Sequence, residues 1–199
     1  MSNDLSPDSA DTVGSTLGST PDRALDQALG SAKGVGDWRL DPQKSTVEFH
    51  SRSIWGLVPV KGSFRTFEGE GQVAPDGTVT GTLTIQADSL DTGHTKRDKH
   101  LRSKDFFDVE NHPTLALKIA GADRIGNARL RVTAELQVLG TTKAIEFDAE
   151  VVSVGESSVQ LRAETVIARA DFGMTWNQLG MMKPNTTTQV VITFTRDAA

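Results

Sequence analysis

The chain has 199 residues, of which 37% are hydrophobic and 24% charged, a balance typical of a soluble globular protein. Its net charge of -5 predicts no general affinity for nucleic acid, because that affinity depends on clustered Lys and Arg. There are no cysteines, so disulfides, Cys-ligated zinc, iron–sulfur clusters and thiol catalysis are excluded.

Residues 1–36 consist mostly of Ser, Thr, Asp, Gly and Ala and contain no aromatic side chain. Such a segment buries too little surface to offset its conformational entropy, so we predict an acidic, disordered tail. A short helix over Asp22 to Leu29 is the alternative for part of it. The start of the sequence has no signal-peptide pattern, and no later window has the apolar length of a membrane span. We therefore expect a cytoplasmic protein without an integral membrane segment.

From Trp38 onward, apolar and polar residues alternate almost to the end of the chain. Leu130, Val132 and Ala134, for example, alternate with Arg131 and Thr133, as in strands with one buried face. Short turns rich in Gly, Asn and Asp separate these segments, which favours antiparallel neighbours. About eight long strands of this kind form a sandwich or a barrel, and closure favours the barrel because it removes exposed edges. Residues 37–199 are thus predicted to be one all-β domain, an eight-stranded antiparallel β-barrel.

The segment between Leu90 and Leu115 interrupts this alternation. Thr95 to Lys104 is rich in Lys, Arg and Leu and predicts a short helix across one end of the barrel. We expect Phe106 and Phe107 to point towards the barrel as an apolar wedge. The next strand should begin after Pro113, since proline disfavours helix in the residue before it.

The same segment concentrates titratable side chains, which raises the question of catalysis or metal binding. His94, His100 and Asp98 would converge on a metal only if the loop folded back on itself, and their spacing matches no metal motif. Asp98, Asp105 and Asp108 are the carboxylates of this segment, and Asp98 and Asp105 have Lys or Arg directly beside them, which lowers a carboxyl pKa, whereas a general acid needs it raised. No G-x-S-x-G sequence is present. We predict a non-catalytic protein without a metal or cofactor.

Several motifs, in order along the chain, resemble the YceI-like family: Trp38-x-Leu-Asp-Pro, Val60-Lys-Gly-Ser-Phe, Asp88-Ser-Leu-Asp-Thr-Gly, Arg97-Asp-x-His-Leu-Arg-Ser-x-Asp-Phe-Phe-Asp, His112-Pro and Arg169-Ala-Asp-Phe-Gly. The resemblance covers about residues 37–196. It implies an extended, lipocalin-like barrel with a helix near one end and a long amphiphile inside, such as a polyisoprenoid, an isoprenoid quinone or a fatty-chain amide. Members of this family are similar to lipid carriers, many of them periplasmic. A homodimer is compatible with the resemblance.

The predicted function is binding, sequestration or transport of that amphiphile. Its polar head would lie near the basic side chains of the helix, Lys96, Arg97, Lys99, Arg102 and Lys104. The alternative is a stress-related protein-interaction module whose barrel is filled by its own side chains. The candidate ligand-binding residues are apolar or aromatic apart from His100: Phe49, Ile54, Trp55, Phe64, Ile85, His100, Phe106, Phe107, Leu117, Leu136, Phe147, Phe172, Met174 and Trp176.

Overall fold

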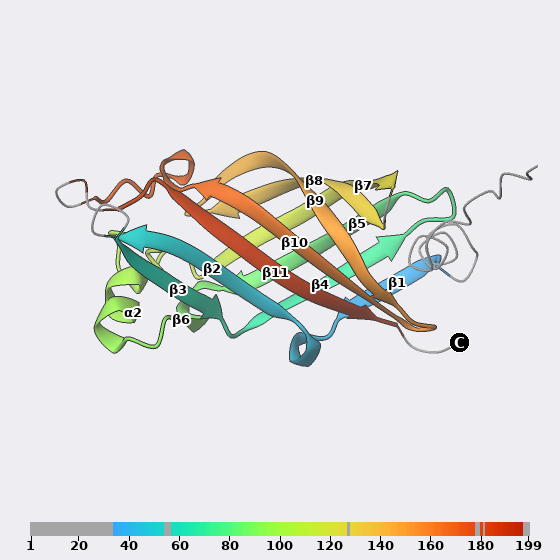
Figure 1. The fold of residues 1–199 in the computed structure, drawn as a ribbon, viewed down its shortest axis with the longest axis horizontal. Helices are drawn as coiled ribbons and strands as arrows, with labels where there is room; N and C mark the ends of the chain where they lie inside the picture. Colours follow the sequence, from blue (N-terminus) through green and yellow to red (C-terminus); the bar gives the residue numbers. More distant parts are fainter. Residues whose placement is uncertain (1–33, 54–56, 127, 178–179, 181, 197–199) are drawn as a thin grey trace, which may run out of the picture.

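A computed structural model of the chain describes residues 34–53, 57–126, 128–177, 180 and 182–196. This part consists of antiparallel strands, one short α-helix and three 3-10 helices (Figure 1). The predicted tail and the alternative helix over Asp22 to Leu29 lie outside the described residues, apart from the last residues of the tail. The strands are β1 (Gly36–Leu40), β2 (Thr46–Ser53), β3 (Val58–Phe64), β4 (Phe67–Val73), β5 (Val79–Gln86), β6 (Leu90–Asp91), β7 (Thr114–Gly126), β8 (Arg129–Val138), β9 (Thr141–Val154), β10 (Ser158–Ala168) and β11 (Asn185–Thr195). The helices are α2 (Thr95–Arg102), η1 (Pro42–Lys44), η2 (Ala87–Ser89) and η3 (Arg169–Phe172).

The sheet closes into a barrel. Its ring runs β1, β4, β5, β7, β8, β9, β10 and β11, and it closes because β1 also pairs with β11. At the α2 end, β2 takes the place of β1 beside β11, β3 pairs with β2, and β6 pairs with β3. The predicted eight-stranded antiparallel barrel with a helix near one end is therefore confirmed.

The break between β1 and β2 has a clear sequence cause. Pro42 cannot donate to a strand ladder, and the Asp41 carboxylate accepts the Gln43 N–H at 3.0 Å to begin η1. The neighbouring strand β11 continues past the break. There the Asp41 N–H donates to the Thr193 carbonyl at 2.8 Å, and the Thr193 N–H donates to the Ser45 hydroxyl at 2.9 Å. The two halves thus act as one long strand with a bend.

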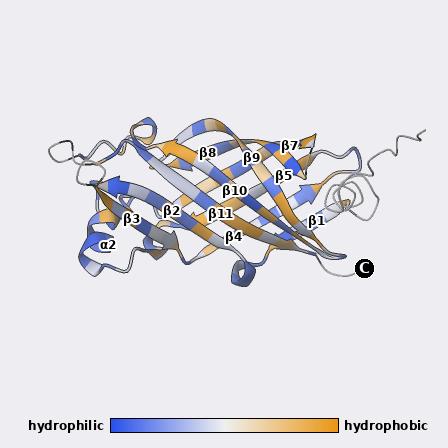
Figure 2. Ribbon diagram, viewed as in Figure 1, coloured by the Kyte–Doolittle hydropathy of each residue, from blue (hydrophilic) through white to orange (hydrophobic). Residues whose placement is uncertain are grey.

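The alternation predicted from the sequence is visible along the strands (Figure 2). In β8, Leu130, Val132 and Ala134 are buried, and the residues between them are exposed. The turn from β8 to β9 consists of Leu139 and Gly140, both with positive φ, as in the tight turns that match strand twist. One face of these strands therefore points into the barrel.

The two ends of the interior are filled differently. The α2 end is rich in large side chains, whereas the other end contains many alanines and valines. The first cluster includes Phe49, Phe64, Phe67, Leu90, Leu101, Phe106, Phe172 and Met174. The second includes Ala128, Leu130, Val132, Ala134, Ala149, Val151 and Ala163.

Candidate functional site

The barrel contains a cavity of about 240 Å³ that borders both core clusters. Apolar side chains make up nearly all of its wall, with Val132, Ala149 and Ala163 towards the alanine-rich cluster. Each water-sized position takes up roughly 10 to 15 Å³ of such a cavity. With one methylene group at each position, the cavity holds a chain of about a dozen or more methylene groups. The interior can therefore hold a long apolar chain.

Most of the predicted ligand-binding residues lie on the cavity wall. They come from six strands, from the segment after α2, from η3 and from the loop that follows η3. The wall includes Phe49, Phe64, Ile85, Phe106, Phe107, Leu117, Leu136, Phe147, Phe172 and Met174.

Four predicted residues do not belong to that wall as described. His100 and Trp176 pack edge to face with ring centroids 4.6 Å apart, and both contact Phe106, which is itself on the wall. Both therefore pack against a residue of the wall. Ile54 and Trp55 lie outside the described residues.

Helix α2 and the segment after it cover the barrel at the end drawn on the left in Figure 1. Leu101, Phe106 and Phe107 reach the cavity, and Phe107 packs edge to face on Phe64 with centroids 5.7 Å apart. The wedge predicted from the sequence is present. We call the segment from Thr95 to Phe107 the lid.

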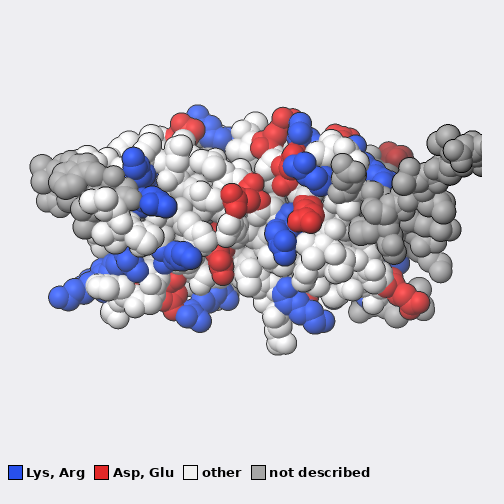
Figure 3. Space-filling model, in the orientation of Figure 1, with Lys and Arg blue, Asp and Glu red and all other residues white. Residues whose placement is uncertain are grey.

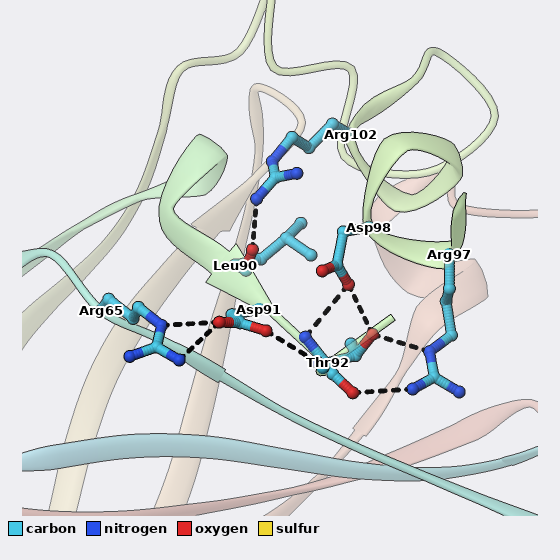
Figure 4. A network of polar contacts seen from close by, with 8 residues as sticks. Arg65, Leu90, Asp91, Thr92, Arg97, Asp98 and Arg102 are labelled. Atoms are coloured by element: carbon cyan, nitrogen blue, oxygen red, sulfur yellow. Dashed lines mark hydrogen bonds and ion pairs between the residues drawn. The ribbon is translucent and has the colours of Figure 1, made fainter. Parts of the chain in front are cut away.

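A polar network attaches the lid to β6 and the residue after it (Figure 4). The buried Asp98 carboxylate accepts the Thr92 N–H at 3.0 Å, and Arg97 donates to the Thr92 hydroxyl and carbonyl at 2.7 and 2.8 Å. Arg102 donates to the Asp88 carbonyl at 2.8 Å and to the carbonyl of Leu90. These arginines stabilise the lid.

A second part of this network lies on β6 itself. The Asp91 carboxylate accepts the Gly93 N–H at 2.7 Å and the Arg65 Nε–H at 2.8 Å. The backbone N–H of Gly93, followed by the Arg65 guanidinium, lowers the pKa of Asp91 from its ordinary value. Asp91 therefore stays ionised in moderately acidic solution.

The arrangement of the basic lid residues differs from the predicted head-group site. Arg97 and Arg102 bond to backbone carbonyls and a hydroxyl, and neither lies on the cavity wall. Lys96, Lys99 and Lys104 are exposed. In Figure 3, Lys and Arg side chains gather at the lid end of the face shown, on the outside of the molecule.

The titratable residues of the lid have structural roles. His94 Nδ1 accepts the Arg97 N–H at 3.3 Å and caps α2, and the His100 ring lies 3.2 Å from the Asp105 carboxylate. Within the described ranges, no group of three His, Asp or Glu side chains is placed to hold a metal ion. None of the described helices has the length and apolar character that crossing a bilayer requires.

The sequence reasoning missed the polar part of the cavity wall. Arg169, only 8% exposed, lies there, and so does the Ser51 hydroxyl. The missed signal was the alternation of β10: Ala163, Thr165 and Ile167 point inward, and the next position of this series is Arg169. The remaining polar residues of the wall are Thr82, Thr165, Thr186 and Thr188.

A closed, eight-stranded antiparallel barrel with an apolar interior and a helical lid belongs to the class of barrels that can enclose a small ligand. The YceI-like domain family matches residues 38–197, so the chain belongs to the YceI-like family.

Known relatives agree with this assignment. A UPF0312 protein of Vibrio cholerae is 35% identical over 129 residues, which are 63% of this chain and 68% of that protein. Protein YceI of Escherichia coli is 31% identical over 129 residues, 61% of this chain and 65% of that protein.

Solved structures share the fold at lower identity. BcnA of Burkholderia cenocepacia superposes with a TM-score of 0.71 at 19% identity, covering 77% of this chain and 98% of BcnA. A polyisoprenoid binding domain from Saccharophagus degradans, implicated in plant cell wall breakdown, has a TM-score of 0.65 at 16% identity. That match covers 80% of this chain and 98% of the domain.

Proposed function

We propose that this protein binds a long-chain amphiphile inside the barrel and sequesters or carries it without catalysis. The observation that carries the proposal is the apolar cavity that borders both core clusters. The polyisoprenoid-binding domain of Saccharophagus degradans, which shares the fold, supports a lipid as the ligand. An isoprenoid, a quinone with an isoprenoid chain and a fatty-chain molecule all fit this description.

The energetics favour a long chain over a short metabolite. Burying one methylene group contributes about 0.8 kcal/mol, whereas association costs on the order of 4 to 15 kcal/mol. A dozen or more buried carbons are needed to offset that cost. The apolar wall offers a short polar metabolite few hydrogen-bonding partners, so it does not suit one.

The lid supports reversible binding. Its covering residues, Leu101, Phe106 and Phe107, contact the cavity, while its polar bonds go to residues that are not on the cavity wall. A chain can then enter when the apolar contacts separate. The alternative of an interaction module requires a filled barrel, and the cavity argues against it.

The test is native mass spectrometry of the purified full-length chain together with organic extraction and loading with a hexadecyl-chain probe. Wild-type protein should carry or take up one chain per barrel. Ala163→Phe places a ring in the cavity and should reduce uptake at least tenfold. Val166→Phe is the matched control, because Val166 lies on the same strand but is 57% exposed on the outer face. A wild-type barrel that neither carries nor accepts a chain would refute the proposal.

A further inference from the structure

Arg169 is the one charged side chain among the described residues of the cavity wall. It is the first residue of η3, directly after β10, and is 8% exposed. Its Nη2 donates to the Lys183 carbonyl at 3.1 Å. Within the described part of the chain, its Nε and Nη1 have no hydrogen-bond partner. A guanidinium thus lies inside an apolar barrel with unused donors.

Burial lowers the pKa of Arg169 from its ordinary value. A guanidinium nevertheless keeps its proton in proteins, so the positive charge remains. Leaving a buried charge without a counter-ion is costly, and native proteins rarely keep one without a function. The described cavity wall contains no carboxylate that could compensate it.

The cavity wall has further polar residues on three adjacent strands, β10, β11 and β2, and with Arg169 they make up the polar patch of the wall. Thr165 of β10 pairs in register with Thr188 of β11, and Ser51 of β2 lies next to the pair His50 and Thr187. The Ser51 hydroxyl is buried and, within the described residues, also lacks a partner. Serine and threonine hydroxyls can donate to the same acceptor as the guanidinium. The patch lies at the lid end, and apart from Thr82 the wall beyond it is apolar.

We propose that this patch, which we call the Arg169 site, binds the head group of the amphiphile, and that the head group is a carboxylate. This inference rests on the proposed function, because the chain must lie in the barrel for its head to reach Arg169. A guanidinium binds a carboxylate through two parallel N–H donors, and one carboxylate neutralises one arginine. A diphosphate would bring more negative charge than the described wall can neutralise, and an alcohol would leave Arg169 uncompensated. The ligand class is therefore a long-chain monocarboxylic acid.

The test compares three ligands of equal chain length: hexadecanoate, hexadecanamide and hexadecanol. Their affinities are measured by displacement of a fluorescent chain probe from the full-length protein. Wild-type protein should prefer the acid by about 10- to 100-fold, the usual effect of hydrogen bonds to a charged group. Acetate alone should not displace the probe, because it lacks the chain.

Arg169→Met and Arg169→Gln should abolish the preference for the acid while still binding hexadecanol. Arg162→Met is the matched control, because Arg162 is exposed on the outer face of the same strand. It should keep the wild-type preference. Thermal melts of the ligand-free variants confirm that each barrel is folded.

The outcomes separate the two proposals. Equal binding of acid and alcohol by wild-type protein, or a preference that survives in both Arg169 variants, would overturn the Arg169 site and leave the carrier function standing. Displacement by acetate alone would also overturn it, because the site would then bind free anions. No binding of any chain would overturn both.

Discussion

The lid and the Arg169 site both contain arginine, but they use it in opposite ways. In the lid, Arg97 and Arg102 donate to backbone carbonyls and a hydroxyl that fix α2 to the barrel. In the cavity, Arg169 keeps two nitrogens without a partner among the described residues. The number of charges is higher in the lid, yet the unsatisfied donors are in the barrel. The binding site is thus indicated by unpaired hydrogen-bonding groups rather than by charge density.

The largest effect should come from the apolar surface beneath the lid. Leu90 is fully buried, with its side chain 0% exposed. Leu90→Ala should lower the free energy of unfolding by about 2 to 5 kcal/mol, through lost burial and the cavity it leaves. Urea unfolding measures this change. Val166→Ala, at an exposed position, is the control and should change stability by less than about 0.5 kcal/mol. Equal effects of the two would show that Leu90 is not packed in the apolar cluster that includes Leu101 and Phe106 of the lid.

The same substitution at the two kinds of arginine should have effects of opposite sign. Arg102→Met removes the bonds to the Asp88 and Leu90 carbonyls and should destabilise the protein by about 1 to 3 kcal/mol. Urea unfolding of the variant and of wild-type protein measures the difference. An unchanged midpoint would mean that these bonds do not hold the lid.

Arg169→Met should instead stabilise the ligand-free barrel, by about 1 kcal/mol, because it removes an uncompensated buried charge. The lost bond to the Lys183 carbonyl makes the net gain small. Thermal unfolding after extraction of any bound lipid measures it. Destabilisation as large as that of Arg102→Met would assign Arg169 a structural role instead.

The smallest expected effect is on folding stability at acidic pH. The folded-state pKa of Asp91 is below its ordinary value of 3.8, so its ionised form contributes stability at higher pH. That contribution is complete above the ordinary value and is lost as the pH falls through the lower folded-state value. Asp91→Asn should therefore reduce stability at pH 7 slightly and flatten its decline below about pH 4. Urea midpoints at pH 7 and pH 3 measure the difference, and parallel declines in both proteins would contradict the role of Asp91.

Much of the fold could be predicted from the sequence because alternation has a direct geometric meaning. The inward residues of β8 and β9, the helix beginning at Thr95 and the start of β7 after Pro113 all follow from local pattern and backbone chemistry. The wall positions of Phe106 and Phe107 follow from the same reasoning. These features depend only on neighbouring residues in the chain or on the two-residue alternation of a strand.

The polar part of the site could not be predicted in the same way. Whether an arginine is satisfied depends on residues outside its own strand or helix, such as Asp88 for Arg102 in the lid or Lys183 for Arg169 in the cavity. The sequence reasoning therefore placed the head group beside the lid, where the basic residues are most numerous. It also counted His100 and Trp176 among the ligand contacts, and in the structure both rings pack against Phe106 of the cavity wall.

The central claim is that the chain lies inside the barrel with its head at Arg169. The most direct measurement is a crystal structure of the full-length protein with 16-bromohexadecanoate, in which anomalous scattering locates the bromine. We expect the bromine in the barrel near Ala149 and Ala163, with the carboxylate within hydrogen-bond distance of Arg169. A bromine on the outer surface, or a carboxylate at the exposed lysines of the lid, would contradict the account.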